Sequence, residues 1–231
     1  MALVVSLFQM AVWWQALILL CCMLNCVDSS APSPVLLRIK YNNSFRLTRS
    51  TRTHVQQLQK KYKEQQLGNK HFEDRSRQLK DLPSLSTDFY SWLKLTDSER
   101  LHAAFWDMQA YWNMLEWKRK QLEKEEKEQM VGQAVSLPQS IKYIQLDLRD
   151  LMSQVSNQMS YMQRSSMTPT SAPARVASNP ETSSKTVWDS RVEGYIILRD
   201  LDLYLTKLAR DFLLLASKNV HESAAKKNAG A

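Results

Sequence analysis

The sequence predicts an all-α protein, a four-helix bundle of up-up-down-down topology. Four long segments place apolar residues three or four positions apart, as one face of a helix requires: 44–66, 96–118 or longer, 137–163 and 187–218. Only four glycines occur in 231 residues, and the periodic segments hold few β-branched runs. A long, a short and a long connection join these segments, which is the arrangement that two overhand crossings need.

The composition is typical of one globular domain with appendages. Hydrophobic residues make up 44% of the chain and charged residues 23%, so the chain can bury a sizeable core. The formal net charge is +8, but Lys and Arg occur in every predicted helix and are interleaved with Glu and Asp. We therefore expect no nucleic-acid partner. Weak binding to glycosaminoglycans remains an expectation for a basic extracellular protein.

The first residues predict a secretory signal peptide over 1–29. Met1–Cys26 contains no charged side chain, and its apolar centre, Val12–Leu24, is shorter than the roughly 18–20 residues of a membrane span. Removal of this segment predicts a secreted protein without disulfides, because it contains all three cysteines of the chain, Cys21, Cys22 and Cys26. The alternative is a retained amino-terminal membrane anchor.

An extended lead, 30–43, is predicted to precede the first helix, because it contains Pro32 and Pro34 and shows no period. The sequence Asn42-Asn43-Ser44 at its end is an acceptor site for an asparagine-linked glycan at Asn42.

The first helix, 44–66, has an apolar stripe from Leu47 to Tyr62, and Gly68 follows it as a stop signal. A long crossover then extends to residue 95, and short helical turns are expected within it. The second helix begins at Thr96 and Glu99, which form a capping box, and its charged continuation beyond residue 118 is expected to lie in solvent.

Ser136 caps the third helix, 137–163, and Pro138 lies in its first turn. A second crossover, rich in Ser, Thr and Pro, leads to the fourth helix, 187–218, and residues 219–231 are predicted to form a flexible tail.

No catalytic pattern is present, so neither an enzyme nor a metal or cofactor site is predicted. The four histidines are isolated from one another, and no metal-binding or glycine-rich motif occurs. The remaining possibility is that the protein recognises a partner through exposed helix faces. Trp188 and Arg191, three residues apart at the start of the fourth helix, are the best candidates, because both residue types are enriched in interface hot spots. The alternative is that Trp188 caps the core and Arg191 is a surface charge.

Residues 92–101, WLKLTDSERL, match the pattern W-x-x-L-T-x-x-E-R-L at the start of the second helix in ciliary neurotrophic factor relatives. From the first helix to the fourth, the chain resembles the interleukin-6 cytokine family, in its ciliary neurotrophic factor, cardiotrophin-like and leukaemia inhibitory factor branch. The fold that this resemblance implies is the long-chain cytokine bundle. The function that it implies is that of a secreted monomer that brings class I cytokine receptors together and drives JAK/STAT signalling.

In that branch a Phe-x-x-Lys pair at the start of the fourth helix contacts the leukaemia inhibitory factor receptor, and this chain has Trp188 and Arg191 there. The resemblance also implies a shared signalling chain of the gp130 type on the faces of the first and third helices, and a non-signalling α-receptor in some relatives. Geometry alone offers four candidates for the shared chain: Arg49, Arg52, Lys142 and Arg149.

A lipid-binding amphipathic bundle of the apolipoprotein type is the alternative function. Such a bundle needs wide apolar faces that open on lipid. The stripes in this sequence are narrower and include aromatic residues, which favours a closed core.

Overall fold

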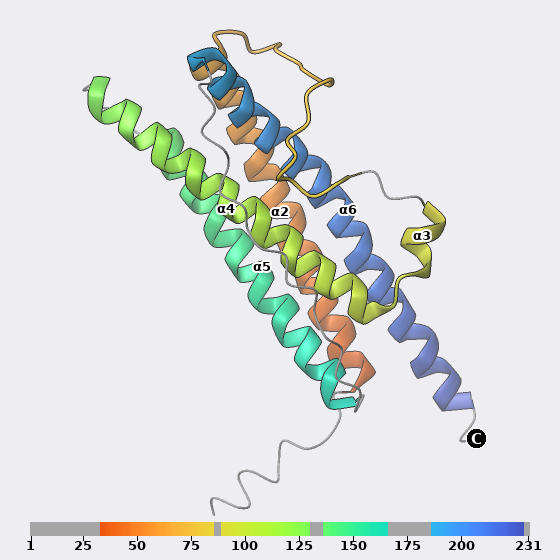
Figure 1. Ribbon diagram of the computed structural model, residues 1–231. Coiled ribbons are helices and arrows are strands. Elements are labelled where there is room, and N and C mark those ends of the chain that lie inside the picture. The colour runs from red at the N-terminus through yellow and green to blue at the C-terminus, as the bar shows by residue number, and fades with distance from the viewer. Residues whose placement is uncertain (1–32, 86–88, 130–135, 166–185, 229–231) are drawn as a thin grey trace, which may run out of the picture. The chain divides into compact units, whose positions relative to one another are not determined.

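A computed structural model describes residues 33–85, 89–129, 136–165 and 186–228 (Figure 1). These ranges contain helices and connecting segments, and no strand. The helices are α2 (Pro34–Leu67), α3 (Phe89–Lys94), α4 (Asp97–Gln129), α5 (Leu137–Ser165) and α6 (Val187–Asn228). The predicted all-α class is confirmed, and four of the helices are long. Within the described ranges, none of them combines the length and the apolar character that crossing a membrane requires.

Cross-helix contacts fix the direction of α2 relative to α5 and α6. Arg52 Nε lies 2.8 Å from Asp202 Oδ1, and ten residues further along α2 the Tyr62 hydroxyl bonds to the carbonyl of Arg191, eleven residues earlier in α6. The two helices are therefore antiparallel. His54 of α2 contacts Asp147 of α5, and Ser44, which is earlier in α2, bonds to Gln154, which is later in α5. Helices α2 and α5 are therefore also antiparallel.

The contacts of α4 complete the topology. Arg100 pairs with Asp211, and Lys118 bonds to Ser190, so α4 is antiparallel to α6 and parallel to α2. Helix α5 lies alongside α4, where Gln145 Nε2 donates a hydrogen bond to the carboxylate of Glu116. Thus α2 and α4 point one way and α5 and α6 the other, which confirms the predicted up-up-down-down bundle (Figure 1).

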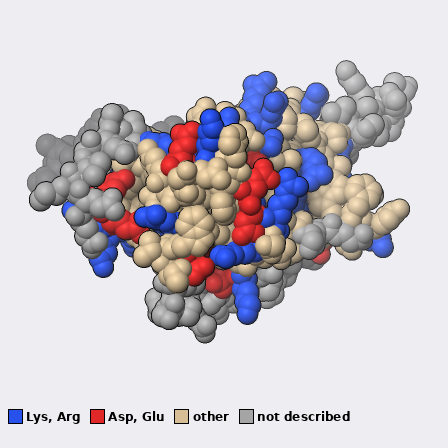
Figure 2. All heavy atoms as spheres, turned by 90° about the horizontal axis from the view of Figure 1, so that it is seen from above, with Lys and Arg blue, Asp and Glu red and all other residues tan. Residues whose placement is uncertain are grey.

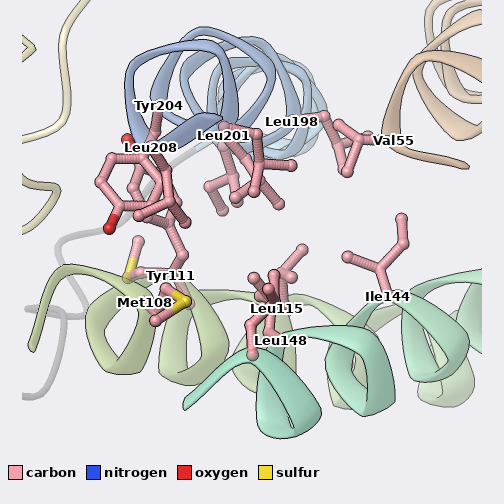
Figure 3. Close-up of a cluster of buried hydrophobic side chains, with 14 of the residues drawn as sticks. Val55, Met108, Tyr111, Leu115, Ile144, Leu148, Leu198, Leu201, Tyr204 and Leu208 are labelled. Atoms are coloured by element: carbon pink, nitrogen blue, oxygen red, sulfur yellow. The ribbon is translucent and has the colours of Figure 1, made fainter. Parts of the chain in front are cut away.

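Side chains from all four long helices form one core (Figure 3). Leu201 of α6 faces Leu115 and Leu148 in this core, and Leu198 lies beside Val55 of α2. All five side chains are buried. Nearby, the rings of Tyr111 and Tyr204 lie 5.1 Å apart, and the Tyr204 hydroxyl donates a 3.1 Å hydrogen bond to the carbonyl of Ala104. The buried hydroxyl of Tyr204 therefore has a hydrogen-bond acceptor inside the apolar core.

The structure differs from the sequence analysis at the start of α2, because residues 34–43 are helical rather than extended. Ser33 caps the helix by accepting a 3.3 Å hydrogen bond from the Leu36 amide, and Pro34 occupies the first turn, where no amide is needed. Tertiary packing then supports this extra length. Tyr41 is buried, and its hydroxyl lies 3.8 Å from Met162 Sδ near the end of α5.

The other helix ends agree more closely with the predictions. The capping box at Thr96 forms, with Glu99 accepting from the Thr96 amide at 2.9 Å. Gly68 ends α2 in the left-handed conformation, at φ 64°. By contrast α6 continues to Asn228, so most of the predicted tail 219–231 is helical. The predicted signal peptide and second crossover lie outside the described residues.

Candidate functional site

The first turn of α6 is formed by a capping box of its own. Thr186 Oγ1 accepts a 3.0 Å hydrogen bond from the Asp189 amide, and the Thr186 hydroxyl donates to Asp189 Oδ2 at 2.6 Å. These bonds lower the pKa of Asp189, with the hydrogen bond from Thr186 as the largest cause. A carboxylate that stays charged at this position also suits the positive end of the helix dipole.

Trp188 lies on this first turn and is 47% exposed. One edge of its ring contacts Phe72, from the segment that follows α2, with ring centroids 6.0 Å apart and an interplanar angle of 84°. Phe72 makes a second edge-to-face contact with Tyr195, about two turns further along α6, with ring centroids 5.1 Å apart. Trp188 is therefore held in place on one side and open to solvent on the other, and it does not cap the core.

The same segment after α2 adds charged groups to this surface. Arg77 Nη1 lies 3.2 Å from Asp189 Oδ1. Arg199 of α6 donates to the carbonyl of Arg77 at 2.8 Å and also to the carbonyl of Asp74. Two backbone carbonyls of the segment are thus hydrogen-bonded to α6. These bonds help to hold Phe72, in the same segment, against Trp188.

Beneath the first turn, side chains from α2 and α4 reach the backbone of α6. The Tyr62 hydroxyl donates a 3.0 Å hydrogen bond to the carbonyl of Arg191, and the ammonium group of Lys118, a buried residue, donates to the carbonyl of Ser190 at 2.8 Å. Burial raises the pKa of Tyr62 well above its ordinary value, so the phenol stays protonated and able to donate. Gly194 leaves the space that both side chains occupy.

Arg191 differs from its predicted role as an open cation. It is half-buried, and its Nε is buried without a hydrogen-bond partner among the described residues. Its carbonyl serves as the acceptor for Tyr62. Phe72 and Arg77 were missed by sequence reasoning, because they lie in a crossover without periodicity and only the fold brings them to Trp188.

The four candidates for the face of α2 and α5 differ in their surroundings. Arg52 is paired with Asp202, so it lies on the α6 side of α2. Arg49 is exposed, with its guanidinium 5.7 Å from the ring of Phe45. Arg52 therefore does not face α5, and the role of Arg49 on a shared face stays a prediction. On α5, Lys142 and Arg149 are both exposed.

A groove of about 510 Å³ marks where α2 and α5 do share a surface. His54 Nδ1 lies 2.9 Å from Asp147 Oδ2 across it. Tyr143 is 55% exposed and Leu146 is 37% exposed at its edge. These residues lie off the core stripe of α5, and an apolar pair on the outer face of a helix is the sequence signal that could have found them.

The short helix α3 presents a second group of exposed apolar side chains, Phe89, Tyr90 and Leu93. Its attachment to the bundle is polar. Trp92 Nε1 and Arg100 Nη1 each donate a 2.6 Å hydrogen bond to the same oxygen of Asp211, and the guanidinium lies 4.7 Å from the Trp92 ring. The hydrogen bond from Trp92 therefore holds α3 against α6, and the cation–π contact holds it against Arg100 of α4.

The predicted glycan acceptor Asn42 lies within α2 and is half-buried, whereas Ser44, the third residue of the motif, is fully buried. The Ser44 hydroxyl donates to Gln154 Oε1 at 2.7 Å and accepts from Gln158 Nε2 at 2.8 Å. The complete motif is accessible only before α2 packs against α5.

The surface around the start of α6 carries charges of both signs. Figure 2 looks onto the molecule from the side of Figure 1 where α6 begins, and basic and acidic side chains lie next to one another there. Among the described residues no cluster of His, Cys, Asp or Glu suited to a metal ion occurs. The surface at the start of α6 thus combines a half-exposed aromatic ring, Trp188, with the ion pair of Arg77 and Asp189.

A family model described as ciliary neurotrophic factor matches residues 30–230, which is most of the chain. A comparison with curated protein sequences finds no significant match. The matched region includes all four long helices, the first turn of α6 and the groove between α2 and α5. The family consists of signalling ligands that bind cytokine receptors. This chain belongs to the ciliary neurotrophic factor family, and it is a helical cytokine of the interleukin-6 type.

Proposed function

We propose that this cytokine is secreted and signals by bringing together two class I receptors, one of the leukaemia inhibitory factor receptor type and one of the gp130 type, with JAK/STAT signalling as the result. Membership of the family supports this reading over a lipid-binding bundle. The observation that carries it is the open ring of Trp188, held by Phe72 beside the ion pair of Arg77 and Asp189.

The first receptor is assigned to this aromatic surface. A tryptophan that is braced on one side loses little side-chain entropy when its other side is covered, which favours a hot spot. Arg77 and Asp189 form the polar rim. Arg191 contributes mainly by shaping the first turn, because its guanidinium is partly buried and its carbonyl is engaged by Tyr62.

The shared signalling chain is assigned to the groove between α2 and α5. Tyr143 and Leu146 offer exposed apolar surface there, and His54 with Asp147 offers polar contacts. Lys142 and Arg149 lie on the same helix and are retained as rim charges. Arg49 and Arg52 are not part of this assignment.

The test uses the chain from residue 30 onward, refolded as a monomer, and soluble receptor ectodomains of both types. We expect Trp188→Ala to weaken binding to the leukaemia inhibitory factor receptor type by at least about 30-fold, since hot-spot truncations typically cost 2 kcal/mol or more. Binding to the gp130 type should be unchanged. Tyr143→Ala combined with Leu146→Ala should have the opposite selectivity.

Phe89→Ala is the matched control, because it removes an exposed aromatic ring from α3 without touching either surface. Circular dichroism and melting should be unchanged in all of these variants. Full affinity of a folded Trp188→Ala protein for both receptors would refute the assignment of the first site. A phospholipid-clearing activity without receptor binding would instead favour the lipid-binding alternative.

The glycan at Asn42 and cleavage of residues 1–29 are part of the same proposal of secretion. Mass spectrometry of the protein from the medium of expressing cells would identify both. We expect a chain that begins near residue 30, with the glycan added before α2 packs, because Ser44 is buried in the folded protein.

A further inference from the structure

Helix α2 carries almost all of the net charge of the protein. It contains eight basic residues and one acidic residue, Glu64: Arg38, Lys40, Arg46, Arg49, Arg52, Lys60, Lys61 and Lys63. The other long helices, α4, α5 and α6, together contain sixteen basic and sixteen acidic residues. The net charge of the whole chain is +8, and α2 accounts for +7 of it. The expectation that Lys and Arg are interleaved with Glu and Asp in every helix is therefore wrong for α2.

Three of these cations repeat along one line of the helix. Arg38, Arg49 and Lys60 are separated by eleven residues each, which is close to three turns, so their side chains leave α2 in nearly the same direction. Successive members are about 16 Å apart along the axis at 1.5 Å per residue. All three are exposed, and so is Arg46 on the turn before Arg49. We call these four residues the α2 cation row.

The α2 cation row has no acidic partner within the part of the chain that the structure describes. The ion pair that α2 makes with α6 uses Arg52, which is three residues from Arg49 and is directed toward Asp202. Arg49 contacts only the ring of Phe45 among charged or aromatic groups, at 5.7 Å. Three such cations on one line, with Arg46 beside them, leave a positive potential that an external polyanion can neutralise.

The neighbouring side chains favour one class of polyanion. Thr53 shares the exposed side of α2 with Arg49 and Lys60, and no exposed Phe, Tyr or Trp ring lies on this helix to stack with nucleic-acid bases. Exposed apolar residues occur only near the amino-terminal end, at Val35, Leu36 and Ile39. This is too small a group to insert a whole helix face into a bilayer.

We propose that the α2 cation row binds a linear sulfated polysaccharide. A chain of this kind carries sulfate and carboxylate groups in series, so it can engage cations spaced along one helix without a shaped pocket. The larger hollow of about 1010 Å³ beside α2 is not included, because Glu73, Asp200 and Asp202 line it together with basic residues. The row also lies apart from His54, which borders the α2–α5 groove.

Heparin is the probe, with the chain from residue 30 onward and affinity measured at 150 mM NaCl. Arg38→Gln, Arg49→Gln and Lys60→Gln are combined in one variant. Its matched control combines Lys142→Gln, Arg149→Gln and Arg210→Gln, which removes the same net charge from exposed positions on α5 and α6. Since each exposed ion pair typically contributes a factor of up to about five, we expect the α2 variant to bind at least about tenfold more weakly.

The control variant should lose less than about threefold, and chemically desulfated heparin should bind neither protein. Equal losses in the two variants would overturn the proposal, because attraction would then follow net charge alone. Tighter binding to a single-stranded oligonucleotide or to phosphatidylserine vesicles, lost in the same α2 variant, would overturn the assignment to a polysaccharide. Circular dichroism would verify that both variants are folded. We expect this result because all six substituted residues are exposed.

Discussion

The side chain of Tyr62 crosses over Gly194, and its hydroxyl donates a 3.0 Å hydrogen bond to the carbonyl of Arg191. Lys118 approaches the same glycine from α4 and bonds to the neighbouring carbonyl, that of Ser190. Side chains from two helices thus set the position of the first turn of a third. That turn carries Trp188, so the contact links the interior of the bundle to the proposed receptor surface.

Gly194→Ala should destabilise the protein although alanine is the better helix former. A Cβ at this position would overlap the Tyr62 hydroxyl and lie 2.5 Å from Lys118 Cε. Overpacking of this kind costs about 1–3 kcal/mol, against about 1 kcal/mol gained in helix propensity. Urea unfolding would measure the difference. A variant at least as stable as the original chain would contradict the close approach of Tyr62 and Lys118.

Tyr62→Phe should weaken binding through Trp188 more than its effect on stability explains. It removes one hydrogen bond, of about 1 kcal/mol, and releases the first turn of α6. Tyr204→Phe is the matched control, because it removes an equivalent bond to the carbonyl of Ala104 in the middle of the bundle. Both variants should melt at similar temperatures. If they reduced affinity for the leukaemia inhibitory factor receptor type equally, Tyr62 would have no positioning role.

Asp211→Ala should be the most destabilising of these substitutions. It leaves the guanidinium of Arg100, which is 1% exposed, without its partner at 2.6 Å, and such a loss costs about 3–5 kcal/mol. It also removes the acceptor for Trp92. Hydrogen exchange should therefore show faster exchange in α3 and at the start of α4 than at the start of α6. Uniform acceleration along α6 would instead indicate general loosening.

Glu116 should make the stability of the protein depend on pH in acid. Its pKa lies at about 2, below the ordinary value of 4.5, mainly because Arg119 donates hydrogen bonds to the carboxylate and Gln145 and Lys120 add to this. The stabilisation is present above pH 4.5 and is lost as the pH falls from 4.5 towards 2. Glu116→Gln should reduce this part of the pH dependence in urea titrations. An unchanged profile would exclude the contribution of Glu116.

The periodicity of the sequence was enough to predict four helices, because burial of a helix face demands apolar residues three and four apart. Thr96 and Glu99 likewise determine the start of α4 through local hydrogen bonds that need no distant partner. The start of α2 could not be predicted from periodicity or from local capping signals. Residues 34–43 have no clear stripe of their own, and it is the contact of Tyr41 with the end of α5 that supports their helix.

The sequence by itself determined the class of fold, the order of the helices and the candidacy of Trp188, since these depend on spacing and residue type along one chain. Only the tertiary structure decided what surrounds that residue. Phe72 lies 116 residues earlier, and no local pattern relates the two. Arg52 could be placed on α2 but not on its α6 side, because the partner that decides its side, Asp202, belongs to a helix at the other end of the chain.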